Sequence, residues 1–204
     1  VNYRVFDAKK MVNILIIQVH AGPEKVELPL PEWRNRYREL VDQGADVIIG
    51  HHPHVPQGWE IYRGKPIFYS LGNFYFDIDY DHELWNRSYA VSLIFEGSKL
   101  DYFKIIPIER TASGVNICKN KLYAEYLNYL CEILSPKNYL NLVNEQSLKL
   151  WETRYRNLYL QAVTAFPDKG LWKFARKLIW KYIKKKNFIN NLSILHNLKI
   201  ESHR

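Results

Sequence analysis

The chain has 204 residues, 47% of them hydrophobic and 15% aromatic, a composition that excludes an intrinsically disordered protein and suits one sizeable domain with or without an extension. The net charge of +8 is uneven, because residues 1–110 carry 13 Lys and Arg against 15 Asp and Glu, whereas residues 111–204 carry 16 against 6. The sequence holds no apolar run of bilayer-spanning length and no start typical of a secretory signal, and we expect Cys118 and Cys131 to be buried free thiols.

Residues 13–19 form the first predicted strand, a largely β-branched run that ends at a histidine. A helix is predicted over residues 32–43, and residues 46–49 form a second buried strand. This strand–helix–strand order predicts two parallel strands joined by a crossover helix. The carboxyl ends of parallel strands share one sheet edge, where ligands bind in open α/β proteins. We therefore expect three histidines to lie at that edge: His20, His52 and His54.

Beyond residue 58 the pattern changes to antiparallel β structure. Residues 59–62 and 66–69 flank a tight-turn signal and predict one hairpin, and residues 88–95 and 100–108 predict another.

The remainder of the chain reads as helical. Helices are predicted over residues 120–134, 138–166 and 168–186, with breaks near two prolines. We therefore expect an α/β domain over residues 1–118 and a basic helical extension over residues 119–204.

The segment His-His-Pro-His at residues 51–54 carries the clearest chemical signal. Pro53 favours an extended conformation for His52, and the spacing places His52 and His54 on one side of the chain, while His51 should point away. Together with His20, these side chains offer three imidazoles to zinc, manganese or iron. The alternative is that each is an ordinary loop histidine.

Three ordered segments carry a family resemblance. They are His-Ala-Gly-Pro-Glu at residues 20–24, Gly-Ala-Asp-Val-Ile-Ile-Gly-His-His-Pro-His at residues 44–54, and Gly-Lys-Pro-Ile-Phe-Tyr-Ser-Leu-Gly-Asn-Phe at residues 64–74. Over roughly residues 12–110 the chain resembles the CapA (poly-gamma-glutamate synthesis, PGA_cap) family of capsule-synthesis proteins, which belong with the calcineurin-like metallophosphoesterases. The resemblance implies part of an α-β-β-α sandwich followed by the helical extension.

The resemblance also implies roles for individual residues. His20 and His52 would bind one metal of a two-metal site and His54 the other, with manganese, zinc or iron as the ion. Glu24 matches the first motif, in which Ala21 replaces the family's usual tryptophan and removes an aromatic wall. Asn73 would orient a ligand, or else serve a turn. His20, Glu24 and Asn73 are thus the candidate catalytic residues, and a phosphoester or capsule precursor is the expected substrate.

Calcineurin-like sites also use an Asp-X-His motif, a bridging aspartate and a Gly-Asn-His segment, and residues 1–19 supply none of them. We therefore expect the carboxyl-terminal part of a split or truncated family member, in which the two-metal centre does not assemble without the missing ligands. The exposed edge of its parallel sheet should favour self-association.

Residues 168–186 carry eight cations and one acid, with apolar residues at helical spacing. This helix is expected either to pack on the domain or to lie on an anionic membrane surface, and nucleic acid is the least favoured partner. Two other functions stay open: a non-catalytic accessory protein, and a zinc hydrolase or hydratase with one ion held by three histidines.

Overall fold

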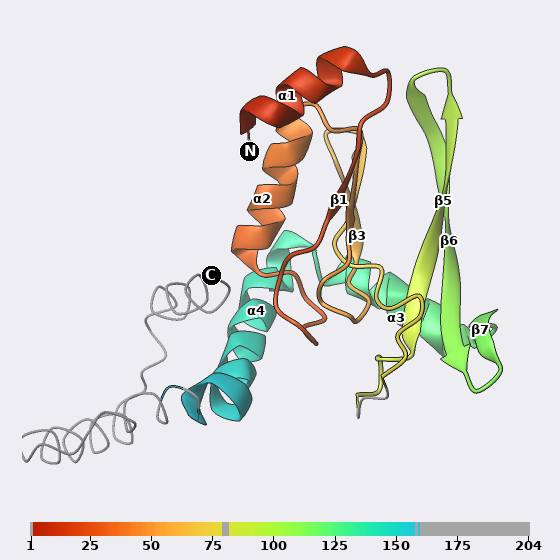
Figure 1. Ribbon diagram of the computed structural model, residues 1–204. Helices are drawn as coiled ribbons and strands as arrows, with labels where there is room; N and C mark the ends of the chain where they lie inside the picture. The colour runs from red at the N-terminus through yellow and green to blue at the C-terminus, as the bar shows by residue number, and fades with distance from the viewer. Residues whose placement is uncertain (1, 79–81, 158, 160–204) are drawn as a thin grey trace, which may run out of the picture. The chain divides into compact units, whose positions relative to one another are not determined.

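A computed structural model describes residues 2–78, 82–157 and 159, and Figure 1 shows the order of their helices and strands. The chain divides into two compact units, residues 1–143 and residues 144–204, and each is described by itself. The first unit contains every strand of the described part of the chain, arranged in one four-stranded and one three-stranded sheet. The protein is therefore a mixed α/β protein, as the sequence predicts.

The four-stranded sheet contains the first predicted strands. Its order is β1 (Ile16–Val19), β2 (Val47–Gly50), β4 (Lys65–Phe68) and β3 (Trp59–Tyr62). Strands β1 and β2 are parallel and are joined through helix α2 (Pro31–Asp42), which confirms the predicted crossover. Strands β3 and β4 form the predicted hairpin, and β4 also pairs in parallel with β2. The hairpin is thus part of the parallel sheet, a pairing that the sequence patterns did not predict.

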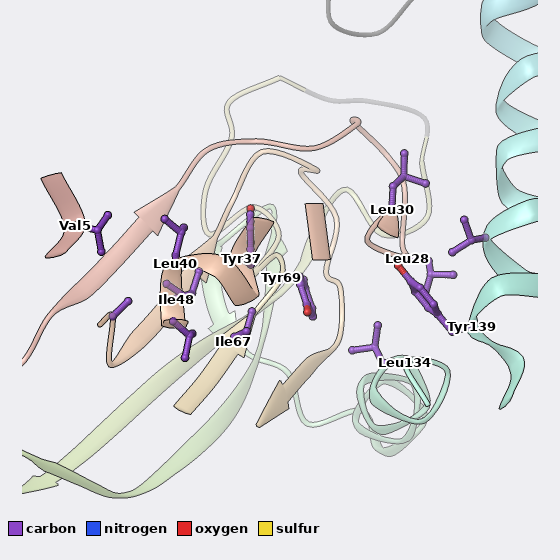
Figure 2. Close-up of a cluster of buried hydrophobic side chains, with 13 residues drawn as sticks. Val5, Leu28, Leu30, Tyr37, Leu40, Ile48, Ile67, Tyr69, Leu134 and Tyr139 are labelled. Atoms are coloured by element: carbon purple, nitrogen blue, oxygen red, sulfur yellow. The ribbon is translucent and has the colours of Figure 1, made fainter. Parts of the chain in front are cut away.

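One face of this sheet packs against α2 in the first hydrophobic core (Figure 2). Tyr37 and Leu40 on the inner side of the helix meet Ile48 of β2 and Ile67 of β4, and all four are almost fully buried. Tyr139 of helix α4 (Pro136–Leu150) belongs to the same cluster. Because the strand residues are covered on both faces, β2 reads as a continuous apolar run.

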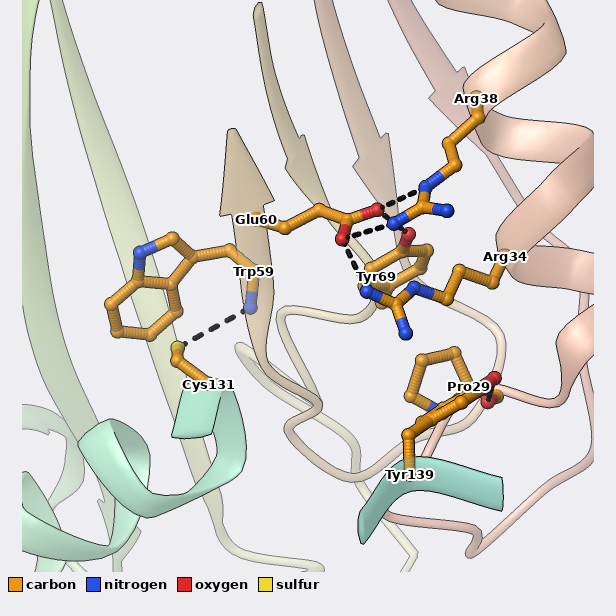
Figure 3. A network of polar contacts seen from close by, with 8 residues as sticks. All are labelled: Pro29, Arg34, Arg38, Trp59, Glu60, Tyr69, Cys131 and Tyr139. Carbon is orange, nitrogen blue, oxygen red and sulfur yellow. Dashed lines mark hydrogen bonds and ion pairs between the residues drawn. The ribbon is translucent and has the colours of Figure 1, made fainter. Parts of the chain in front are cut away.

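A polar cluster ties α2 to the hairpin on the same side of the sheet (Figure 3). The Glu60 carboxylate on β3 accepts hydrogen bonds from Arg34 Nη2 at 2.5 Å and from Arg38 Nε at 2.7 Å. The Tyr69 hydroxyl donates to the same carboxylate at 2.5 Å. Two guanidinium groups and a phenol therefore neutralise and saturate one largely buried carboxylate, as a charged group in a core requires.

The three-stranded sheet is antiparallel and consists of β5 (Arg87–Glu96), β6 (Lys99–Thr111) and β7 (Gly114–Ile117). The β5–β6 pairing confirms the second predicted hairpin. Together with helix α3 (Lys121–Glu132), this sheet meets the other face of the four-stranded sheet in a second hydrophobic core. Its buried members include Val47, Phe68, Tyr89, Leu127 and Leu130.

Helix α1 (Asn2–Met11) was not predicted, because its apolar residues are isolated. Val5 is its contribution to the hydrophobic core. An ion pair attaches the helix to the sheet: Lys9 Nζ lies 2.6 Å from Asp46 Oδ2, and Lys65 Nζ lies 2.6 Å from the other carboxylate oxygen. This helix therefore depends on tertiary charge contacts that a periodicity argument does not detect.

The helical part begins as predicted. Helix α3 agrees with the predicted helix over residues 120–134, and α4 followed by the π-helical turn η1 (Trp151–Tyr155) agrees with the start of the one over residues 138–166. The rest of that helix and the predicted basic helix over residues 168–186 lie outside the described residues. No described helix combines the length and apolar character needed to cross a membrane.

The residues just after 118 contact the strands and loops of the first unit. The Tyr139 hydroxyl donates to the Pro29 carbonyl at 2.6 Å, and the Tyr126 hydroxyl donates to the Glu27 carboxylate. The compact units divide after Val143. The domain boundary expected at residue 118 stays a prediction.

Candidate metal centre

Three of the predicted site residues meet at the carboxyl edge of the four-stranded sheet. His20 follows β1, and His52 and His54 follow β2. One ligand atom from each lies within 4.8 Å of the other two. Ring centroids are 4.7 Å apart for His20 and His52, and 5.6 Å apart for His52 and His54. The group contains three imidazoles and no carboxylate.

Close backbone packing fixes the carboxyl end of the second strand. A Cβ on Gly50 would lie 2.0 Å from the Tyr69 carbonyl oxygen, so this position requires glycine. Main-chain pairing continues beyond the strand, since the His51 amide donates to the Val19 carbonyl at 3.0 Å and the Leu71 amide donates to Gly50 at 3.0 Å. The loop that carries the histidines therefore starts from a fixed backbone.

The protonation of His52 follows from its hydrogen bond. Its Nδ1 lies 2.5 Å from the carbonyl oxygen of Gly22, and a carbonyl only accepts. Nδ1 therefore carries the hydrogen, and Nε2 carries the lone pair through which a neutral imidazole binds a metal. Gly22 has a φ of 107°, so glycine is favoured where this carbonyl is presented.

A second hydrogen-bond chain fixes His54. Its Nδ1 lies 2.9 Å from Asn73 Oδ1, and Asn73 Nδ2 donates to the Trp85 carbonyl at 3.1 Å. The latter bond sets the orientation of the amide, so Oδ1 accepts the Nδ1 hydrogen and Nε2 is left as the donor atom for a metal. His54 also has a φ of 60°, a left-handed conformation that costs energy in a non-glycine residue and is typical of functional positions.

Electrostatics favour a neutral imidazole at His20. Burial lowers the pKa of His20, and positive charge on His52 or His54 would lower it further. Metal ligands must be neutral imidazoles, so this shift favours the binding form near neutral pH. Burial also lowers the pKa of His51, as would positive charge on His20, and His51 is outside the three-histidine group.

Two predicted features of the first motif have different outcomes. Glu24 is half-buried, its carboxylate is not a member of the three-histidine group, and its catalytic role stays a prediction. The aromatic wall at Ala21 is absent, as the residue type requires, and two aromatic rings lie beside a different histidine: the rings of Phe76 and Trp85 lie 5.3 Å and 5.5 Å from the His54 ring. Both residues lie in an irregular segment, and no sequence period pointed to them.

The donor set fits a divalent transition metal. Three convergent imidazoles are common ligands of zinc and are accepted by manganese and iron. Two of the three have their Nδ1 hydrogen held by a carbonyl or amide oxygen, the arrangement that fixes ring orientation in metal sites.

Comparison with known proteins identifies relatives of the part that carries these histidines. Residues 2–78 match the family model described as bacterial capsule synthesis protein PGA_cap. The PGA biosynthesis protein CapA of Bacillus subtilis (strain 168) is 38% identical over 108 residues, which are 52% of this chain and 27% of that protein. The capsule biosynthesis protein CapA of Bacillus anthracis is 39% identical over 89 residues, 43% of this chain and 20% of that protein.

A more distant relative carries a related description. A probable polyglutamine synthesis accessory protein of Mycobacterium tuberculosis (strain ATCC 25618 / H37Rv) is 36% identical over 70 residues, 34% of this chain and 18% of that protein. The chain thus spans about a quarter or less of the length of these relatives.

Proposed function

Because this chain belongs, through residues 2–78, to the PGA_cap family of bacterial capsule synthesis proteins, we propose that it acts in capsule or exopolymer synthesis as a metal-dependent phosphoesterase. The observation that carries the proposal is the convergence of His20, His52 and His54 at a sheet edge. The names of the relatives support the capsule role, and the imidazole cluster supports the metal chemistry.

We propose that the three imidazoles hold one ion. Two nitrogen ligands of one tetrahedral ion, each about 2.1 Å from it, lie about 3.4 Å apart. The ligand atoms of the group all lie within 4.8 Å of one another, so the three side chains would close inward by roughly 1 Å on binding the ion. A second ion, with His54 among its ligands, stays a prediction for a site with further carboxylates.

The ion would supply a water of lowered pKa and positive charge for the developing charge on the phosphoryl oxygens. The chain's own residues bind and orient: Gly22 and Asn73 hold the Nδ1 hydrogens of two ligands. Phe76 and Trp85 pack beside the His54 ring. We assign Glu24, in the turn after His20, as the candidate proton-transfer group.

Hydrolysis of bis(p-nitrophenyl) phosphate by the protein loaded with manganese, zinc or iron tests this proposal. We expect turnover that requires metal and is lost in His52→Ala, together with a strong decrease in Glu24→Gln at unchanged metal content. Metal-independent turnover, or equal activity in His52→Ala, would contradict the assignment.

Two partner proposals accompany this function. Strand β1 lies at the edge of the four-stranded sheet in the described part of the chain, and its Ile16 is 41% exposed, so we propose pairing between copies through β1. The basic segment 168–186, outside the described residues, is proposed to contact an anionic membrane surface, and nucleic acid is not proposed.

A further inference from the structure

The segment that follows Asn73 combines one aromatic ring packed at the site with three exposed apolar side chains. Phe76 turns inward onto His54 and Trp85, with ring centroids 5.3 Å from each. Three other side chains of this segment are exposed, Phe74 by 64%, Tyr75 by 57% and Ile78 by 60%. Large apolar side chains gathered on a surface mark a binding site more often than isolated ones do. We call Phe74, Tyr75 and Ile78 the apolar rim.

A cation also lies over the Trp85 indole. The Lys25 amide donates to the Pro53 carbonyl at 2.8 Å, and Lys25 has a φ of 59°, so its backbone is fixed against the histidine loop. Its Nζ lies 5.7 Å from the Trp85 ring, and that ring lies 5.5 Å from the His54 ring. The Lys25 ammonium and the His54 imidazole therefore both lie beside the Trp85 ring.

The charge of the loaded site selects an anion. Because the ligand group contains no carboxylate, a bound divalent ion keeps its two positive charges, while the neighbouring Glu24 and Lys25 carry opposite charges. Such a site attracts a phosphoryl group strongly. The apolar rim is continuous in sequence with Asn73, whose amide holds His54. Phe74 follows Asn73 directly, so its Cα lies about 3.8 Å from that of a residue whose side chain contacts His54.

We propose that the site takes amphiphilic phosphoesters, with the phosphoryl group at the ion and Lys25 and an apolar substituent on Phe74, Tyr75 and Ile78. This inference rests on the proposed function and specifies its substrate class. The rim contributes binding in proportion to the apolar area that it covers, about fourfold in affinity for each fully buried CH₂ group and less for a half-covered chain.

Calorimetric titration of the zinc-loaded protein with methyl-, butyl- and octylphosphonate tests the inference. We expect affinity to rise by about twofold per added CH₂ group. In the double variant Phe74→Ser/Ile78→Ser the increase of affinity with alkyl chain length should largely disappear, and the affinity for methylphosphonate should be unchanged. Lys25→Gln should weaken all three ligands by a similar factor and leave the rise intact.

Matched controls are available on distant surfaces. Ile61 on β3 is 57% exposed, so Ile61→Ser removes a comparable apolar side chain, and Lys99→Gln removes an exposed charge from the β5–β6 turn. Neither substitution should change the affinities for the three phosphonates. The inference would be overturned if affinity did not depend on alkyl chain length in the unaltered protein. It would also be overturned if that dependence persisted in the double variant, as expected if the rim binds a protein partner or a second copy instead.

Failure of the proposed function gives a different result. Metal content, measured on the same samples, decides whether the histidines bind an ion. The titration is repeated on metal-free protein, because Lys25 and the apolar rim are parts of the chain itself. A chain-length dependence there, with no metal retained, would contradict the phosphoesterase and preserve the amphiphilic anion site.

Discussion

His54 and Asn73 are joined by a hydrogen bond of 2.9 Å between Nδ1 of the imidazole and Oδ1 of the amide, and Asn73 is itself fixed through the Trp85 carbonyl. This contact converts a flexible loop histidine into an oriented ligand. Two segments far apart in sequence, one after β2 and one after β4, therefore determine the geometry of the candidate centre together.

Asn73→Ala should weaken metal binding by 10- to 100-fold, because removal of the oxygen that holds a ligand's ring nitrogen typically has that effect. The change is read from a competition titration with a chromophoric chelator. Asn116→Ala on β7 is the control, since its side chain is exposed and bonds only within its own turn. Equal affinities in the two variants would contradict an orienting role for Asn73.

Gly50→Ala should destabilise the protein by about 3 kcal/mol, because the added methyl would meet the Tyr69 carbonyl at 2.0 Å and neither backbone can move easily. Urea denaturation gives the free energy of unfolding. Gly97→Ala is the comparison: nothing lies within 4 Å of its added methyl, and its φ of 59° should cost about 1 kcal/mol. A Gly50 variant as stable as the Gly97 variant would show that the strand end is not constrained.

Acid should weaken the fold through Glu60. Burial raises the pKa of this carboxyl, but hydrogen bonds from Arg38, Arg34 and Tyr69 outweigh burial and lower the pKa to about 2 from an ordinary value of 4.5. A carboxyl group whose pKa is lowered in the folded state stabilises the protein at pH values above its unfolded-state pKa. That stability is lost as the pH falls from about 4.5 toward 2.

The measurement is the free energy of unfolding against pH for the unaltered protein and Glu60→Gln. We expect the variant to be less stable by about 3 kcal/mol at pH 7, because two arginines lose their anion, and to show a shallower decline below pH 4.5. Glu39→Gln, which breaks an exposed pair with Arg36, should change little. Parallel pH profiles for the unaltered and Glu60→Gln proteins would refute the assignment.

The exposed edge of β1 should lead to association. Light scattering at micromolar concentration should give a mass above that of one chain, and Ile16→Lys, which places a charge on the edge strand, should reduce it. A stable monomer in the unaltered protein would count against pairing through β1.

The convergence of the three candidate ligands was predictable from sequence because each follows an apolar strand, and parallel strands bring their carboxyl ends together. His20 is distant in sequence from His52 and His54, which are separated by one proline. The strand–helix–strand order nevertheless places all three at one sheet edge. The two hairpins were predictable for the same kind of reason, since local turn residues set their pairing.

Features that depend on contacts distant in sequence were not predictable. Strand β4 takes its place beside β2 through a parallel register that no local pattern encodes. Phe76 and Trp85 belong to an irregular segment, so their contacts with His54 leave no periodic signal. Helix α1 is attached largely through Lys9 and Asp46, an ion pair across 37 positions.

Metal content of the purified chain tests the central claim most directly. The protein is incubated with manganese, zinc or iron, desalted and analysed by mass spectrometry beside His52→Ala and the control His82→Ala, whose Nδ1 accepts from the Leu84 amide outside the cluster. We predict one retained ion per chain in the unaltered protein and the control, and none in His52→Ala. No retained ion, or the same content in His52→Ala, would contradict a metal centre built from these three histidines.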